Sequence, residues 1–260
     1  MTRPSELGAE LWSKVQSEPS KQFWIGPDHV YDYSALSRMV LRYSALLSHN
    51  RVSPGQRMLI QSRDDWVTFK LWLSALLNGV VPVLVSPESA TDRLDAIAGR
   101  VEPKVIFTTE DMLLLSDEAN TRATAERIPL QDALDDAPVE AEPRLCMADT
   151  EIACVQMTSG SLKEPKGVVL THENVQVHLA TVARVLNMSA TSRIYNGLVL
   201  HHADGLMQGP LLALGAGATL VRPHKFSAER MPTDMAWFAE MGSTHMITAP
   251  AFLALVDRNC

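Results

Sequence analysis

The sequence predicts an α/β protein with mostly parallel sheets flanked by helices. Short apolar runs alternate with segments of helical periodicity through the first half of the chain, as they do in βαβ units. The chain is 46% hydrophobic and 20% charged, which is typical of a globular protein with a packed core. Its 260 residues suit one large domain or two small ones.

The first predicted helix follows Ser34, whose hydroxyl is of the kind that caps helices. Its apolar face recurs at a spacing of about 3.6 residues. That face consists of Leu36, Met39, Val40, Tyr43 and Leu47. The apolar run RMLIQ at 57–61 then predicts a short buried strand.

A second helix is predicted at 64–79. Asp64 and Asp65 lie at its positive end, where carboxylates are stabilising, and Gly79 follows its last turn. Residues 80–85 predict a strand, in which Pro82 would suit a sheet edge or a strand end. A helix at 90–100 and a strand at 104–108 complete this βαβ rhythm.

Residues 110–149 differ from the rest of the chain because they are acidic and poor in aromatic residues. We expect a solvated connection there, with room for one helix, and assign no binding role to its charges.

Regular elements are predicted again from residue 151 onward. Thr171 can cap the first helix of this half, and Pro232 lies at or near the opening of the second. The predicted strands are 151–157, 167–171, 193–200, 217–221 and 244–248, and the predicted helices are 172–187, 227–242 and 249–258. We expect a first α/β subdomain over 1–150 and the start of a second, with a ligand loop, over 151–260.

Charge and composition exclude several classes of protein. The net charge of -7 argues against a nucleic-acid binder, which would show a basic face. The longest apolar stretch, 71–85, is interrupted by Asn78, Gly79 and Pro82, so we expect no membrane span. No secretory signal is visible, and three sparse cysteines, Cys146, Cys154 and Cys260, fit a reducing, cytoplasmic compartment. Buried thiols are favoured over a catalytic cysteine.

The loop TSGSLKEPKG, residues 158–167, lies between two predicted strands. Small residues let the backbone approach a ligand, and consecutive N–H groups in such a turn favour an anion. Hydroxyls and Lys166 add donors and positive charge, so the composition favours phosphate binding. The P-loop pattern does not fit, because Lys166 precedes Gly167 and a strand follows.

This loop resembles the T-S-G-S-T-G-x-P-K-G motif of the adenylate-forming superfamily, which includes acyl-CoA synthetases, fatty acyl-AMP ligases and peptide-synthetase adenylation domains. The following VVLTHENV is similar to the family's V-x-x-[ST]-H-x-N. The resemblance covers nearly the whole chain, through YDYSALSRMVLRYSALL, the stretch from PGQRMLIQ to VLVSP, and HHADGLMQGPLLALGAGATLV.

Two departures from the family pattern matter. Leu162 and Lys163 replace the family's T-G, which removes a hydroxyl and a glycine; Lys163 favours the fatty acyl-AMP ligase branch, or is a solvated lysine. Family members are also about twice as long, and their Y-G-x-T-E motif, T-G-D aspartate and C-terminal lysine segment are not found here. We therefore expect the N-terminal part of a longer enzyme, without its lid domain and inactive alone; a natural short form is the alternative.

The histidine pair in LVLHHADGLMQG admits several interpretations. A metal site is disfavoured, because adjacent strand residues point to opposite faces and no third ligand is evident. A general base of the kind found in peptide-synthetase condensation domains is also disfavoured. The spacing from the histidine pair to Asp204 is two residues shorter than in the H-H-x-x-x-D-G motif of those domains. The family resemblance implies that His202 lines the carboxylate pocket and that its neighbours shape the acyl pocket; a partly buried strand histidine without a ligand is the alternative. The implied neighbours are Gly205, Leu206, Met207 and Gly209.

The resemblance implies a two-step ligase that uses Mg-ATP. A carboxylate attacks the α-phosphate to give acyl-AMP and pyrophosphate, and the thiol of CoA or of a phosphopantetheine carrier protein then takes the acyl group. The residues expected to bind the phosphates are Thr158, Ser159, Gly160, Ser161, Lys163, Lys166 and Gly167. An acyl or aryl acid is favoured over an amino acid, in fatty acid metabolism or natural product biosynthesis. A non-catalytic scaffold or nucleotide-binding module remains the alternative; the acid, the thiol acceptor, the pathway and the oligomeric state stay open.

Overall fold

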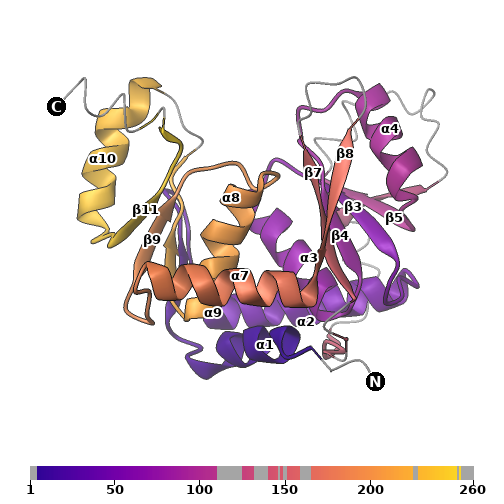
Figure 1. The fold of residues 1–260 in the computed structure, drawn as a ribbon, viewed down its shortest axis with the longest axis horizontal. Coiled ribbons are helices and arrows are strands. Elements are labelled where there is room, and N and C mark those ends of the chain that lie inside the picture. Colours follow the sequence, from indigo (N-terminus) through magenta and orange to yellow (C-terminus); the bar gives the residue numbers. More distant parts are fainter. Residues whose placement is uncertain are drawn as a thin grey trace. The chain divides into compact units, whose positions relative to one another are not determined.

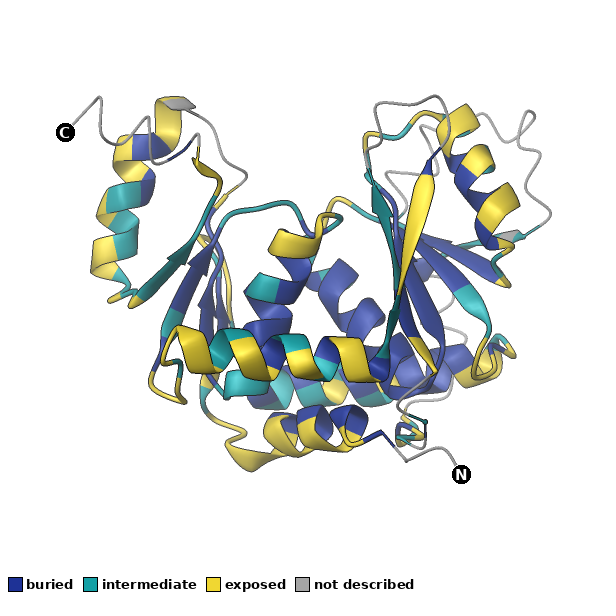
Figure 2. Cartoon of the chain, viewed as in Figure 1, coloured by how far each residue is buried: buried dark blue, intermediate teal, exposed yellow. Residues whose placement is uncertain are grey.

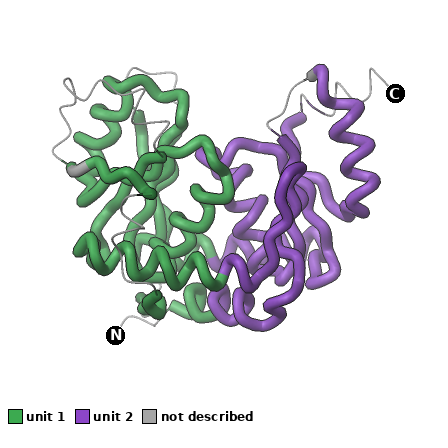
Figure 3. Tube along the Cα trace, turned by 180° about the vertical axis from the view of Figure 1, so that it is seen from behind, with its two compact units in different colours: residues 1–9, 37–175 green, residues 10–36, 176–260 purple. Residues whose placement is uncertain are grey.

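The computed structural model describes residues 5–109, 125–131, 140–145, 147–148, 151–158, 165–224, 228–250 and 252. The chain divides into two compact units, each made of two segments (Figure 3). Unit 1 contains residues 1–9 and 37–175, and unit 2 contains residues 10–36 and 176–260. Each unit is built around one sheet flanked by helices, as the predicted fold class requires. The predicted subdomains, 1–150 and 151–260, stay a prediction, because compact units and subdomains need not coincide.

Unit 1 holds a six-stranded sheet in the order β6-β5-β3-β4-β7-β8. Its first five strands are parallel, and β8 pairs antiparallel with β7 at one edge. The strands are β3 Arg57–Gln61, β4 Val81–Leu84, β5 Val105–Thr108, β6 Glu126–Pro129, β7 Ile152–Thr158 and β8 Lys166–Thr171. The predicted strands at 57–61, 80–85 and 104–108 are thereby confirmed within a residue or two.

The central strands of unit 1 are apolar on both faces, because helices cover both (Figure 1). Helix α4, Thr91–Val101, packs its buried side chains against Leu59, Val83 and Ile106. Alternate residues point to the opposite face, and Met58 and Phe107 are as buried there. Figure 2 shows the contrast between buried β3 and β4 and the exposed edge strand β8.

Helix α3, Asp65–Leu77, begins and ends as the sequence predicts. The Asp64 carboxylate accepts a hydrogen bond from the Val67 N–H at 2.9 Å, and Gly79 adopts a positive φ of 70° just beyond the helix. The helix buries a lysine as well as its apolar residues: Lys70 is 6% exposed. Its Nζ lies 5.0 Å from the Trp66 ring centroid and 5.8 Å from that of Tyr43.

The sheet-edge position predicted for Pro82 was wrong, because β4 is an interior strand between β3 and β7, but Pro82 lies one residue from the start of that strand. The Val81 N–H donates to the carbonyl of Gln56, just before β3, at 2.8 Å, and the Val85 N–H donates to the Ile60 carbonyl of β3 at 3.0 Å. Pro82 and Leu84 face β7 instead, since neighbouring residues of a parallel strand bond to opposite sides. Pro82 therefore lacks its N–H on the β7 side, where the register is formed only at Val83 and Val155.

Two further expectations are corrected. Helix α2, Tyr33–His49, is capped by Asp32 rather than Ser34: the Asp32 Oδ1 accepts bonds from Ala35 N–H at 2.7 Å and from the Ser34 hydroxyl at 2.8 Å. The acidic connection also contains a strand, β6, whose pairing with β5 was not predicted. The other residues of 110–149 lie partly outside the described part.

Unit 2 holds a five-stranded sheet in the order β11-β9-β10-β1-β2, parallel except for β2. Tyr195 of β9 packs edge-on against Trp237 and Phe238, so α10 lies against the sheet (Figure 1). The strands are β1 Gln22–Ile25, β2 Val30–Asp32, β9 Arg193–Asn196, β10 Thr219–Val221 and β11 His245–Ile247. The remaining helices are α1 Leu7–Ser17, α7 His172–Val185, α8 Ala203–Leu206, α9 Leu212–Ala216 and α10 Met231–Glu240, with a 3₁₀ turn at Ala228–Arg230.

Helix α1 and strands β1 and β2 were not predicted. The predicted final helix at 249–258 lies almost wholly outside the described residues. Within the described part, no helix is both long and apolar enough to cross a membrane.

Candidate functional site

The predicted phosphate loop closes an antiparallel hairpin in unit 1. Strands β7 and β8 pair from Ile152 opposite Thr171 to Thr158 opposite Lys166, with a shift of register between Ile152 and Cys154. Ser159, Gly160, Ser161 and Lys163 lie outside the described residues. Thr158, Lys166 and Gly167 therefore mark the base of the loop, and the Thr158 hydroxyl donates a hydrogen bond to the Lys166 carbonyl at 3.2 Å.

The topology places this base at the carboxyl edge of the unit 1 sheet. Strand β7 runs parallel to β4 and ends at Thr158, so its last residue lies at the same edge as the ends of β3, β4 and β5. Open α/β sheets bind ligands at this edge. Lys166 is exposed there, so its ammonium group can meet an anion from solvent.

Gly167 has a packing role at the base of the hairpin. A Cβ on Gly167 would lie 2.7 Å from Val155 Cγ1 and 3.4 Å from Met157 Sδ. The first distance is shorter than carbon atoms approach, so a larger residue would require the Val155 side chain or β8 to shift. Gly167 therefore lets β8 lie close to β7 at the base of the hairpin.

The hairpin leads directly into α7, whose predicted cap is confirmed. The Thr171 hydroxyl accepts from the Asn174 N–H at 3.2 Å, and Asn174 Oδ1 accepts from the Thr171 N–H at 3.1 Å. This reciprocal pair is a capping box with an amide in place of the usual glutamate or glutamine. His172 begins the helix and is 1% exposed.

The second predicted group belongs to unit 2 and follows a strand that is shorter than predicted. Strand β9 ends at Asn196, and His202 precedes the four-residue helix α8. A π-helical turn, Met207–Leu211, and then α9 follow. The two histidines are thus not alternating strand residues; their ring centroids lie 5.2 Å apart, and His202 is exposed.

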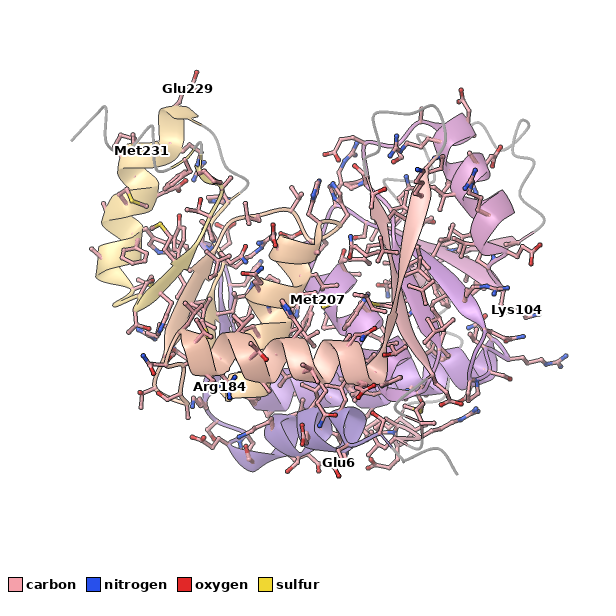
Figure 4. All side chains as sticks on the ribbon, viewed as in Figure 1. Glu6, Lys104, Arg184, Met207, Glu229 and Met231 are labelled. Carbon is pink, nitrogen blue, oxygen red and sulfur yellow. The ribbon has the colours of Figure 1, made fainter. Side chains whose placement is uncertain are left out.

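Gly205, Leu206 and Met207 lie in the interior of unit 2. Leu206 is 0% exposed and Met207 4%, and Met207 lies on the turn beyond α8 (Figure 4). A Cβ on Gly205 would lie 2.0 Å from the Val199 carbonyl oxygen, so only glycine fits. The structure thus groups His202 with these three residues in unit 2, and Thr158 with Lys166 and Gly167 in unit 1.

Sequence reasoning missed a buried polar pair beside this segment. Asn196, at the end of β9, is 0% exposed, and Arg222, directly after β10, is 5% exposed. The guanidinium donates to the Asn196 carbonyl at 2.8 Å and lies 3.4 Å from its side-chain oxygen. A polar residue that ends an apolar strand, as in RIYN and TLVR, was the available signal.

Neither metal-ion nor thiol chemistry has support in the described residues. Among them, no group of three or more His, Cys, Asp or Glu side chains could hold a metal ion. Cys154 is 1% exposed, and burial raises the pKa of its thiol to about 12. Since the thiolate is the nucleophile, this cysteine is inert at neutral pH.

Comparison with known proteins agrees with the resemblance seen in the sequence. A family model described as AMP-binding enzyme matches residues 11–258. Malformin synthetase mlfA of Aspergillus niger (strain ATCC 1015) is 29% identical over 217 residues, which are 82% of this chain and 4% of that protein. D-lysergyl-peptide-synthetase subunit 1 of Claviceps purpurea is 20% identical over 258 residues, 95% of this chain and 8% of that protein. The chain thus spans a small part of these relatives.

Solved structures share the fold. O-succinylbenzoate coenzyme A synthetase of Bacillus subtilis, in complex with AMP, aligns with a TM-score of 0.84 at 20% identity, covering 100% of this chain and 65% of that one. The N-terminal domain of FACL13 from Mycobacterium tuberculosis aligns with a TM-score of 0.83 at 20% identity, covering 98% and 64%. A fatty acyl-adenylate ligase from L. pneumophila, with acyl adenylate and pyrophosphate, aligns at 0.77 and 19% identity, covering 92% and 43%.

Proposed function

Because the chain belongs to the AMP-binding enzyme family, we propose that the whole protein activates a carboxylic acid with ATP and passes the acyl group to a pantetheine thiol. The observation that carries the proposal is the family match over residues 11–258, which includes the loop 158–167. Experiment must identify the carboxylic acid and the thiol acceptor.

The first step joins the acid to AMP. A carboxylate oxygen attacks the α-phosphorus of ATP, a phosphorus–oxygen bond breaks, and pyrophosphate leaves with the electron pair. Charge builds up on the leaving group, so the step needs cations and N–H donors around the β- and γ-phosphates. Mg²⁺ bound to the nucleotide would supply part of that charge.

We assign the protein's share of this charge to the loop. Lys166 supplies a cation, Thr158 a hydroxyl, and Gly167 the close contact between β8 and β7 at the base of the loop. The loop residues proposed to join them are Ser159, Gly160, Ser161 and Lys163. In the second step the thiol sulfur attacks the acyl carbon, and AMP leaves.

The segment around α8 is proposed to hold the acid, with His202 beside the carboxylate and Gly205, Leu206 and Met207 shaping the acyl pocket. The side chain of Asp204 accepts a hydrogen bond from Gln208 Nε2 at 2.9 Å, so this carboxylate is engaged by the π-helical turn that follows α8. An aspartate so placed is a poor partner for a substrate amino group. We therefore favour an acyl or aryl acid.

Amino-acid activation is the second candidate, and a specific observation favours it. One of the synthetases that the chain resembles, D-lysergyl-peptide-synthetase subunit 1, is named for a peptide and for an acid. Its name supports a carrier-protein thiol over CoA as the acceptor, because synthetases of peptides hold their intermediates on carriers. The acid panel below separates the two candidates.

The test is carboxylate-dependent exchange of pyrophosphate into ATP by the full-length gene product. Fatty, aryl and amino acids are compared, and Lys166→Ala is compared with Lys104→Ala. Lys104 is the matched control because it is also exposed but precedes β5, at the amino edge of the same sheet (Figure 4). We expect exchange with one acid class, reduced about 10-fold or more by Lys166→Ala and unchanged by Lys104→Ala.

Exchange with no acid, from folded full-length protein, would reject the proposal. The family fold would then serve a non-catalytic role, as a scaffold or a weak nucleotide binder. Equal exchange by the two lysine variants would leave adenylation standing but remove Lys166 from the phosphate site.

A further inference from the structure

The further inference concerns how unit 2 holds its acid-binding segment, which we define as residues 197–211. This segment leaves the sheet after β9, turns through α8 and ends with the π-helical turn. It contains every residue that we assign to the acid pocket, and its path is irregular. Irregular backbone keeps one conformation only where other groups determine it.

Asn196 contacts this segment at three places. Its Oδ1 accepts a hydrogen bond from the Leu198 N–H at 2.9 Å, and its Nδ2 donates to the Asp204 carbonyl at 2.9 Å. Its side chain also lies against Gly209, where a Cβ would be 3.1 Å from Nδ2. One buried amide thus holds the start, the middle and the end of the segment.

Arg222 holds Asn196 in turn. Its NH1 donates to the Asn196 carbonyl at 2.8 Å and lies 3.4 Å from Oδ1, so it reaches the oxygen that also accepts from Leu198. Because Arg222 is 5% exposed, its charge strengthens these bonds in a medium of low dielectric. The pair therefore links the ends of β9 and β10 to the segment.

The segment cannot adapt freely if this link is lost. Gly205 has no room for a side chain, because a Cβ there would lie 2.0 Å from the Val199 carbonyl oxygen. Gly209 has non-helical dihedrals, φ −101° and ψ −110°, inside the π-helical turn. Such turns are common at functional sites and are kept by specific contacts. Movement of the Asp204 carbonyl would displace α8, and His202 and Met207 flank that helix.

We propose that Asn196 and Arg222 are positioning residues that hold the segment 197–211 in one conformation and so determine which carboxylic acids the enzyme accepts. The inference rests on the proposed function, because the pocket role of the segment is part of it. Asn196 and Arg222 do not contact the reacting atoms; they act through the backbone that carries His202 and Met207. Misplacement of a binding group by about 1 Å can cost about 100-fold in rate.

The test uses Asn196→Asp, which keeps size and the acceptor for Leu198 but replaces the donor to the Asp204 carbonyl with an oxygen. The matched control is Asn78→Asp in unit 1. Asn78 is 4% exposed, and its Nδ2 likewise donates to a helix carbonyl, that of Ser74, at 2.8 Å. Arg222→Lys keeps the charge and loses the planar fork. Pyrophosphate exchange by the full-length protein is measured with a series of acids of increasing size.

We expect Asn196→Asp and Arg222→Lys to lower kcat/KM for the best acid about 10- to 100-fold and to change the ranking of the acids. Asn78→Asp should leave the ranking unchanged, whatever it does to the melting temperature. If the two Asn variants lose stability alike and neither changes the ranking, Asn196 is merely structural and the proposal is wrong.

A second readout keeps this test separate from that of the proposed function. Amide hydrogen exchange of peptides within 197–211 should be faster in Asn196→Asp than in Asn78→Asp, whether or not any acid is activated. If amide exchange within 197–211 is faster in Asn196→Asp but the wild-type protein shows no pyrophosphate exchange, the positioning role is supported and the adenylation proposal is rejected. Unchanged amide exchange in this segment would overturn the positioning role itself.

Discussion

Replacing Lys70 with methionine should stabilise the protein near neutral pH. The ammonium group is buried between two aromatic rings, and burial lowers the pKa of Lys70 from 10.5 to about 8, with Asp64 acting in the opposite direction. The difference, 10.5 − 8, corresponds to about 3 kcal/mol, at about 1.36 kcal/mol for each pKa unit. The favourable contacts of the cation with the Trp66 and Tyr43 rings offset part of that cost, at about 0.5–2 kcal/mol each. We therefore expect a gain of up to about 2 kcal/mol for Lys70→Met.

The gain must depend on pH in a defined direction. Between pH 8 and 10.5 the unfolded chain keeps the Lys70 proton and the folded protein loses it, so the folded protein becomes more stable as pH rises through this window. The methionine variant lacks this contribution. The stability difference should therefore be largest below pH 8 and shrink toward pH 10.5.

Urea-induced unfolding of wild type and Lys70→Met, at pH values on both sides of 8, measures this difference. Lys104→Met is the control, since that lysine is exposed and its replacement should have no such pH dependence. A destabilised Lys70→Met protein at pH 7, or a difference that does not change with pH, would refute the reasoning. The contacts with the rings would then outweigh the cost of burial.

Three further predictions concern single residues. Gly205→Ala should lower stability by about 3 kcal/mol or more, because its Cβ would meet the Val199 carbonyl oxygen at 2.0 Å, and thermal unfolding measures the loss. Asp64→Ala should cost about 1 kcal/mol in urea unfolding, because it removes the cap bond to Val67, whereas Asp64→Asn should restore most of it. Cys154 should resist iodoacetamide at pH 8 in folded protein and react only in denaturant, as peptide mass mapping would detect; labelling of the folded protein would contradict its burial.

Most elements of the two sheets could be predicted because their sequence patterns are local. Helix α3 has its cap and its terminating glycine in sequence, and the apolar runs of β3 and β5 are short and bounded by polar residues. Helix α1 was missed although Leu7, Leu11 and Val15 recur at helical spacing and are buried. Strands β1 and β2 were missed because they have only four and three residues. In addition, β1 pairs with β10, which lies far along the chain, so local sequence patterns cannot predict that pairing.

The overlong prediction for β9 has a specific cause. The apolar run continues to Leu200, but Asn196 bonds its own side chain to the Leu198 N–H and ends the strand. Side chains of this kind compete with sheet hydrogen bonds, and the outcome depends on the distant Arg222. The family resemblance pointed to His202 and its neighbours, whereas the pair that holds them could be found only once both strand ends were in place.

The most direct test of the central claim follows oxygen from acid to nucleotide. The full-length protein is given ATP, thiol acceptor and an active acid whose carboxylate carries heavy oxygen, and the nucleotide product is analysed by mass spectrometry. Attack of the carboxylate on the α-phosphorus, followed by acyl transfer, predicts AMP that has gained one heavy oxygen. Unlabelled AMP, or ADP as the product, would contradict an acyl-adenylate intermediate.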